Sequence, residues 1–198
     1  MPTITRLVAG KRDPSRISIY IDGKFACSLS AEEVISRGLV RGYELSENDQ
    51  ATLLDKSTKE KLLSKILNFI SYRPRSQKEI RDRLKKYKAT SEQIEDIVNK
   101  ITKLGVLNEQ EFAKYLVESR RAQGRSSRHI KSELKSQGID KEVSEDSLVN
   151  GSNDRATVRE LIKRKSHLEK EKLIAYLARR GFPWELVREA LSEYNEPY

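Results

Sequence analysis

The residues best suited to chemistry lie in one basic stretch, from Arg73 to Lys88, and that chemistry is the binding of anions. Eight of its sixteen residues are Lys or Arg, and only two are acidic. Ser76 is followed three residues later by Glu79, which is the pattern of a capping box: the hydroxyl accepts a bond from a backbone N–H, and the carboxylate reaches back to the cap. A helix is therefore predicted to begin at Ser76.

This predicted helix has one apolar face and one cationic face. The residues that share the apolar face at helical spacing are Ile80, Leu84 and Tyr87. The residues that fall roughly opposite, at about 100° per residue, are Lys78, Arg81 and Lys85. The apolar face is expected to be buried and the cationic face to remain in solvent.

The same pattern recurs fifty residues further along, from Arg125 to Gly138. The cap and the apolar positions are matched by Ser126, Ile130 and Leu134, and the basic positions by Arg128, Lys131 and Lys135. A third copy, from Glu169 to Gly181, keeps the apolar frame but has Glu171, Ile174 and Ala178 at the basic positions. The third copy thus retains the frame and loses the charge.

The positive charge of the chain is concentrated in its middle. The formal net charge is +9, but residues 1–56 hold 8 basic and 8 acidic residues and residues 139–198 hold 11 and 12. Residues 57–138 hold 20 and 10. Such clustering indicates a polyanionic or strongly acidic partner, with nucleic acid as the first candidate. A solvated, solubilising surface is the alternative, and the repetition of the same basic positions favours binding.

The first 56 residues are predicted to form a small α/β head. Two alternating apolar segments flank Asp22-Gly23, which is a strong β-hairpin signature because this dipeptide tolerates the positive φ of a type I′ turn. Residues 3–8 can supply a third strand, and Cys27 alternates with core candidates and is expected to be buried. Ser30 opens a short helix that ends near Gly38, and Ser46 is expected to open a second short helix.

From residue 57 onward the pattern is helical, in three units of three. The helices are predicted near 58–72, 76–87 and 91–104, near 109–122, 126–137 and 141–149, and near 153–166, 169–180 and 184–194. A period of 43–50 residues with a common frame indicates a helical repeat array. The fold class is therefore mainly α, with a β-hairpin-containing head. The predicted domains are residues 1–56, 57–107, 108–150 and 151–198, and the polar segment 150–153 is the expected hinge.

The chain resembles the RecX regulatory proteins. The segments that carry the resemblance are GLVRGYEL (38–45), RPRSxxEIxxxL (73–84), LGVLNEQEFA (104–113) and SRxxxGRSxxxIxxEL (119–134). It covers essentially the whole chain and is most specific in residues 73–112 and 119–138. Lys88 departs from the pattern, because family members often have Gly there, and the first middle helix is therefore expected to end less sharply.

The resemblance implies tandem three-helix repeats, some family members having an added β-containing N-terminal segment. It also implies a function: the family modulates the recombinase RecA, typically restraining its filament, strand exchange and ATP hydrolysis, by lodging in the groove of the RecA–DNA filament. RecA and the RecA–DNA filament are accordingly the expected partners, with single- or double-stranded DNA as a direct contact. A role in homologous recombination and DNA repair follows from the same resemblance.

No catalytic constellation is present in the sequence. There is no phosphate-binding loop, no dinucleotide-binding glycine motif and no Cys-x-x-Cys. His129 and His167 have no partners at metal-ligand spacing, so we expect no metal, no cofactor and no enzyme activity. The single Cys, the lack of a long apolar run and the lack of a signal peptide predict a cytoplasmic protein without membrane association. We also expect a monomer.

Aromatic residues offer a second way to contact nucleic acid, by stacking on bases. Most of them, Phe112 among them, fit apolar helix faces better, so core packing is the preferred interpretation. Tyr72 stands beside Arg73 and Arg75 and is left open as a stacking residue.

Two hypotheses remain. In the first, the protein is a RecX-like modulator that binds RecA and its DNA filament and inhibits the recombinase, using a cationic track. The predicted contact residues are Arg73, Arg75, Lys78, Arg81, Lys85, Arg120, Arg121, Arg125, Arg128, Lys131 and Lys135. A row of cations suits a repeating anionic lattice because each neutralised phosphate releases counterions. In the second, the protein is a stand-alone nucleic-acid-binding module without a RecA partner.

Overall fold

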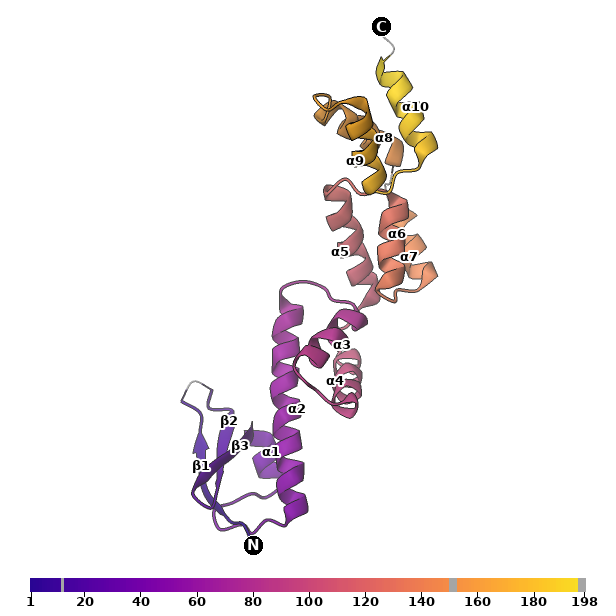
Figure 1. The fold of residues 1–198 in the computed structure, drawn as a ribbon. Helices are drawn as coiled ribbons and strands as arrows, with labels where there is room; N and C mark the ends of the chain where they lie inside the picture. Colours follow the sequence, from indigo (N-terminus) through magenta and orange to yellow (C-terminus); the bar gives the residue numbers. More distant parts are fainter. Residues whose placement is uncertain (12, 150–152, 196–198) are drawn as a thin grey trace. The chain divides into compact units, whose positions relative to one another are not determined.

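The computed structural model of the chain describes residues 1–11, 13–149 and 153–195. Within these residues it contains a three-stranded antiparallel sheet followed by ten helices, so the predicted mainly α fold class is confirmed (Figure 1). The chain divides into two compact units. The first comprises Met1–Phe69 and Leu84–Ile97, and the second comprises Ile70–Arg83 and the chain from Val98 onward.

The sheet of the first unit has the strand order β1-β2-β3, with β1 at Ile4–Ala9, β2 at Arg16–Ile21 and β3 at Lys24–Ser30. Asp22 and Gly23 form the turn between β2 and β3 with φ of 47° and 78°. These positive values are those of the two-residue turn expected from the sequence, and the hairpin prediction is confirmed.

One face of the sheet forms the core of the head together with α1 (Ala31–Ser36) and the start of α2 (Glu47–Ser71). Cys27 is buried in this core, as predicted, and burial raises the pKa of its thiol. The other buried residues of the cluster are Ile4, Ile19, Leu29, Val34, Leu39, Leu45 and Leu53. The cap predicted for α1 is present, because the Ser30 hydroxyl accepts a bond from the Glu33 N–H at 3.3 Å.

The two helices predicted near residue 46 and at 58–72 are one continuous helix, α2, of 25 residues. The prediction of two helices was wrong because residues 47–71 contain no Gly or Pro that would interrupt the helix. The domain boundary expected between residues 56 and 57 falls inside α2. This helix therefore links the head to the helical part of the chain without a break.

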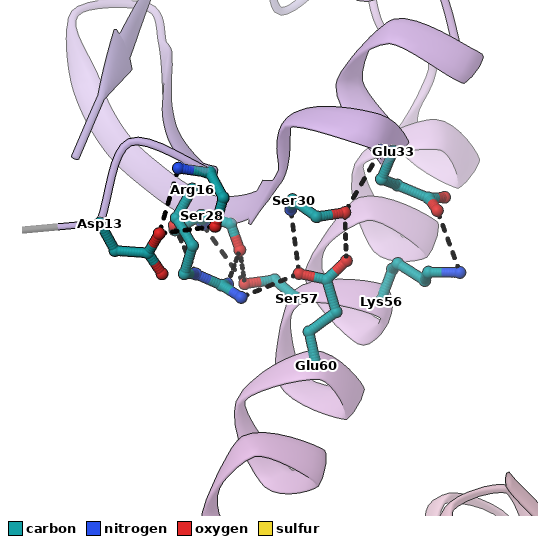
Figure 2. A network of polar contacts seen from close by, with 9 residues as sticks. Asp13, Arg16, Ser28, Ser30, Glu33, Lys56, Ser57 and Glu60 are labelled. Atoms are coloured by element: carbon teal, nitrogen blue, oxygen red, sulfur yellow. Dashed lines mark hydrogen bonds and ion pairs between the residues drawn. The ribbon is translucent and has the colours of Figure 1, made fainter. Parts of the chain in front are cut away.

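A polar network attaches the edge of the sheet to α2 (Figure 2). Ser28 in β3 donates its N–H to the Ser57 hydroxyl at 3.3 Å, and its carbonyl oxygen accepts from the same hydroxyl at 2.8 Å. The Glu60 carboxylate accepts from the N–H of Ser30 at 3.0 Å and from the Arg16 guanidinium at 3.1 Å. These bonds satisfy backbone groups that an open edge strand would expose to solvent.

The remaining helices follow in the predicted order. Their bounds are α3 Gln77–Lys86, α4 Ser91–Lys103, α5 Glu109–Ala122, α6 Ser127–Ser136, α7 Lys141–Val149, α8 Asp154–Arg164, α9 Lys170–Arg179 and α10 Trp184–Asn195. Together with α2 they form three sets of three along the sequence. The hinge predicted at residues 150–153 lies largely outside the described residues.

The middle helix of each set ends in the same way. Lys88, Gly138 and Gly181 follow α3, α6 and α9 with φ of 60°, 80° and 88°, and the residue after each donates its N–H to a carbonyl in the last helical turn. The expectation that α3 ends less sharply was therefore wrong. Lys88 adopts the left-handed conformation that glycine adopts elsewhere, although a side chain makes it costlier by about 1–2 kcal/mol.

Candidate nucleic-acid interface

The helix α3, which was predicted to begin at Ser76 and to carry part of the cationic track, is capped as its sequence indicates. The Ser76 hydroxyl accepts a bond from the Glu79 N–H at 3.0 Å, and the Ser76 N–H donates to the Glu79 carboxylate at 3.4 Å. Ile80 and Leu84 are fully buried. Among the basic residues of α3, Lys78, Lys85 and Lys86 are exposed, whereas Arg81 and Arg83 are half-buried.

Two of the predicted arginines each donate two bonds to one carboxylate. Arg73 donates two bonds to Glu79, at 2.6 and 3.0 Å, and lies over the ring of Tyr115 at 5.4 Å. Arg120 donates two bonds to Glu133, at 2.6 and 2.8 Å. The bond from Arg120 lowers the pKa of the Glu133 carboxyl and raises that of Arg120. These paired charges, largely shielded from solvent, hold the fold together locally.

Three further predicted residues donate to backbone carbonyl oxygens at helix ends. Lys78 bonds to the carbonyl of Ser136 at 2.7 Å. Arg125 bonds to that of Arg179 at 3.0 Å. Arg121 bonds to that of Leu148 at 2.8 Å. Cations at helix C-termini are favourable because the last carbonyls have no partner within the helix.

The cations at matched positions do not share one environment. Lys131 pairs with Glu145 of α7 at 2.8 Å, whereas Arg81, which corresponds to it in α3, is half-buried. Lys78 and its counterpart Arg128 are both exposed, but Lys78 bonds to the carbonyl of Ser136, whereas Arg128 makes no ion pair in the described part of the chain. Lys85 and Lys135 are alike: both are exposed, and neither forms an ion pair with a described residue.

The predicted contact residues therefore differ in how accessible they are to a binding partner. Lys85, Arg128 and Lys135 extend into solvent. Lys131 is also accessible, because exposed ion pairs contribute little and are readily exchanged for another anion. Arg75 and Arg81 are half-buried. The long-range partners Glu133 and Ser136 were missed by the sequence analysis, since no local pattern indicates which distant acid or carbonyl a cation will meet.

In the second unit, the start of one middle helix meets the end of the next one in the sequence. The buried Ser76 hydroxyl at the start of α3 donates to the Gln137 side chain after α6, at 2.8 Å. At the start of α6, the Ser126 N–H donates to the carbonyl of Arg180 after α9, at 3.0 Å. These contacts place the starts of α3 and α6 at junctions between repeats.

Among the described residues, no group of three His, Cys, Asp or Glu side chains is placed so that it could hold a metal ion. The helices described here are also all too short or too polar to cross a bilayer. What the geometry offers is cationic and hydrogen-bonding chemistry.

Sequence profiles of one protein family match most of the chain. Residues 2–46 match the profile described as "Regulatory protein RecX N-terminal domain". Residues 63–100, 108–148 and 156–191 match the first, second and third three-helix domains of RecX.

Proteins that are similar to this chain over nearly its whole length are also described as RecX. The "Regulatory protein RecX" of Bacillus licheniformis is 30% identical over 204 residues, covering 98% of this chain and 78% of the relative. That of Bacillus velezensis is 29% identical with the same coverage. That of Caldanaerobacter subterraneus is 26% identical over 194 residues, covering 96% of this chain and 98% of the relative.

Two solved structures share the fold. A crystal structure titled "regulatory protein RecX" has a TM-score of 0.71 at 22% identity and covers 97% of this chain and 100% of its own. The crystal structure of RecX from Lactobacillus salivarius has a TM-score of 0.54 at 25% identity and covers 68% and 95%.

Proposed function

Since this chain belongs to the RecX family of regulatory proteins, we propose that it regulates the recombinase RecA by binding RecA and its DNA filament. Binding restrains ATP hydrolysis and strand exchange. The observation that carries the proposal is the match of all four RecX profiles, in order, along the chain. The protein acts as a monomer in the cytoplasm, where RecA filaments form, and needs no cofactor.

The charge distribution supports this proposal. The excess of basic over acidic residues lies in residues 57–138, which contain α3 and α6, whereas the head and the third repeat are close to neutral. A filament of DNA coated by a protein is a repeating anionic lattice, and cations presented at intervals bind it with release of counterions. The near-neutral segments are then available for contacts with protein.

The direct contact with the anionic filament is assigned to the accessible cations. Lys85, Arg128 and Lys135 contact phosphates or acidic groups of the filament directly. Lys131 joins them by exchanging Glu145 for a filament anion. The residues bonded within the chain, Arg73, Lys78, Arg120, Arg121 and Arg125 among them, hold the repeats in place and contribute to the positive field.

The test is RecA ATP hydrolysis on single-stranded DNA with and without the protein. The variant K85E/R128E/K135E reverses the three exposed charges and is expected to inhibit at least about tenfold less well. The matched control, K163E/K170E/R188E, changes the net charge equally on exposed positions of the third repeat and is expected to inhibit nearly as well as the wild type. Equal inhibition by all three proteins would remove the cationic surface from the mechanism.

A stand-alone nucleic-acid-binding module is the second candidate, favoured by the same excess of positive charge in residues 57–138. Affinity for DNA measured with and without RecA, at two salt concentrations, separates the two. A regulator of RecA binds the filament more tightly than bare DNA, whereas a stand-alone module binds bare DNA equally well with a steep salt dependence.

A further inference from the structure

The sheet of the head has two edges, which are closed to different extents. The edge formed by β3 is bonded to α2 through the backbone groups of Ser28 and Ser30. The edge formed by β1 lies on the side of the sheet away from α2 (Figure 1). It is closed at its start, where the Ile4 N–H donates to the Tyr43 carbonyl at 2.9 Å and the Ile4 carbonyl accepts from the Gly42 N–H at 2.8 Å. Among the described residues, no other segment pairs with the rest of this edge.

The backbone groups of Leu7 and Ala9 point outward along the open part of β1. The Gly10 N–H donates to the Arg16 carbonyl in β2 at 2.8 Å, which fixes the phase of the antiparallel ladder. Because bonded and non-bonded pairs alternate along such a ladder, Val8 bonds to β2, whereas Leu7 and Ala9 direct their N–H and C=O groups away from it. No described residue bonds to these outward groups. They are therefore available to a further strand.

The side chains beside the open edge are apolar and cationic. Leu7 packs against the core of the head, so its neighbour Val8 lies on the opposite face of the sheet, where it is 40% exposed. Arg6 shares that face and lies over the ring of Tyr20, with its guanidinium carbon 3.9 Å from the ring centroid. Ala9 is exposed and small, so it leaves room for an approaching backbone.

The charge around this edge favours an acidic occupant over a second copy of the chain. Arg6 and Lys11 are exposed, and neither forms an ion pair with a described residue. The nearby Asp13 carboxylate accepts bonds from the N–H and the hydroxyl of Ser15. Two copies paired edge to edge would bring the cations of both chains to one short seam, where like charges oppose pairing. An acidic segment would instead neutralise them.

We propose that the open edge of β1 binds one extended segment of the protein partner, which is RecA in the proposed function, as a fourth strand of the sheet. The inference rests on that function and names the contact made by the head. The backbone of the segment bonds to Leu7 and Ala9, an apolar side chain packs against Val8, and acidic side chains pair with Arg6 or Lys11. In strand addition the main-chain bonds provide affinity, and the alternate side chains provide specificity.

The direct test measures amide hydrogen exchange in the full chain, alone and in a saturated complex with DNA-free RecA, by mass spectrometry at single-residue resolution. Exchange of the Leu7 and Ala9 amides should slow at least about tenfold in the complex, because both gain a bonded partner. The Val8 amide is the internal control, since it is already bonded to β2 and should change little. Unchanged exchange at Leu7 and Ala9 in the complex overturns the proposal.

A proline on the edge tests the same backbone group by substitution. Ala9→Pro removes one outward N–H and keeps the ladder to β2, because proline is tolerated where the N–H faces solvent. It is expected to weaken RecA binding about tenfold. Ala9→Val keeps the N–H and should keep the affinity. Circular dichroism checks the fold of both variants, and the exchange experiment on the wild type does not depend on either. Wild-type affinity in folded Ala9→Pro overturns the proposal.

A charge reversal tests the preference for an acidic segment. Arg6→Glu on β1 is expected to weaken RecA binding about fivefold. Lys24→Glu is the matched control, because it makes the same change of charge at an exposed position of β3 and should keep the affinity. Equal losses in the two variants would mean that the head attracts RecA without using the β1 edge.

The outcomes separate this inference from the proposed function. If the wild type does not bind RecA, both fall. If Ala9→Pro inhibits RecA normally while K85E/R128E/K135E does not, the edge falls and the cationic surface stands. Protection of Leu7 and Ala9 by DNA alone would identify nucleic acid as the occupant, and protection that rises with the concentration of the chain alone would identify a second copy. Either result overturns the assignment to RecA.

Discussion

The two junctions between middle helices in the second unit lie at equivalent positions, and each has a basic side chain bonded to a carbonyl, but the serine that caps the helix makes a different bond at each. Where α6 ends and α3 begins, side chains bridge the gap: Ser76 to Gln137 at 2.8 Å, and Lys78 to the carbonyl of Ser136 at 2.7 Å. Where α9 ends and α6 begins, a backbone bond is added to side-chain bonds: the Ser126 N–H donates to the Arg180 carbonyl at 3.0 Å, and Arg125 donates to the Arg179 carbonyl at 3.0 Å. The second junction is the closer one.

One residue of the repeat accounts for part of the difference. In the first copy Glu79 completes a capping box, so the Ser76 N–H has a partner within its own helix. In the second copy His129 stands at that position, and the Ser126 N–H donates to the following repeat instead. A single change of residue type thus converts a closed cap into a contact between repeats.

The closeness of the second junction predicts the largest effect. A Cβ at Gly181 would lie 2.6 Å from the Ser126 hydroxyl oxygen and 2.8 Å from the His129 Cβ, whereas a Cβ at Gly138 would meet nothing within 4 Å. Both glycines have positive φ. We expect G181A to lower the free energy of unfolding by about 3 kcal/mol and G138A by about 1 kcal/mol. Urea denaturation followed by circular dichroism measures both, and equal losses would mean that the junction is not closely packed.

The bridging role of Ser76 predicts the next effect. S76A removes both the cap of α3 and the bond to Gln137, and is expected to cost about 2 kcal/mol. S126A removes only a cap, since its contact with Arg180 is made by the backbone, and is expected to cost about 1 kcal/mol. The same denaturation experiment measures both variants. A larger loss of unfolding free energy in S126A than in S76A would mean that the Ser76 side chain does not bridge its junction as described.

Lys88 extends the comparison to the end of the first middle helix. Because it holds a positive φ without being glycine, K88G is expected to raise the free energy of unfolding by about 1 kcal/mol. K86G, at the last residue of α3, serves as the control and should not raise the free energy of unfolding, because glycine is unfavourable in a helix. A loss of stability in K88G would show that the lysine side chain contributes more than its backbone strain costs.

The smallest effect concerns pH. The pKa of the Glu133 carboxyl is lowered chiefly by its bonds from Arg120, so its contribution to stability is complete above the unfolded pKa of about 4.3 and is lost as pH falls through the lower folded value. E133Q should therefore be less stable than wild type at neutral pH, by about 1 kcal/mol, and should show a smaller loss between pH 5 and 3. Parallel pH curves for the two proteins would contradict the pairing.

Local patterns were enough to predict most of the fold. Asp22-Gly23 requires a particular turn, and Ser76 with Glu79 satisfies backbone groups within one helix, so both features could be predicted from adjacent residues. The continuity of α2 was missed, although it too is local: one short helix was predicted to begin at Ser46 and another near residue 58, whereas the absence of Gly and Pro from residues 47–71 favours a single helix.

The environment of each cation was not predictable in the same way. Lys131 meets an acid on α7 and Lys78 a carbonyl at the end of α6, and these partners lie 14 and 58 residues away in the sequence. A matched position in a repeat preserves the direction in which a side chain points from its own helix. It does not preserve what the neighbouring helix presents.

The most direct test of the account is a cryo-electron microscopy map of the protein bound to a RecA filament on single-stranded DNA. We expect Arg128 and Lys135 of α6 to lie within ion-pair distance of phosphates or of acidic side chains of RecA, and the near-neutral third repeat to contact protein alone. A map in which the exposed cations of α6 face bulk solvent, while the head or the third repeat contacts the DNA, would contradict the account.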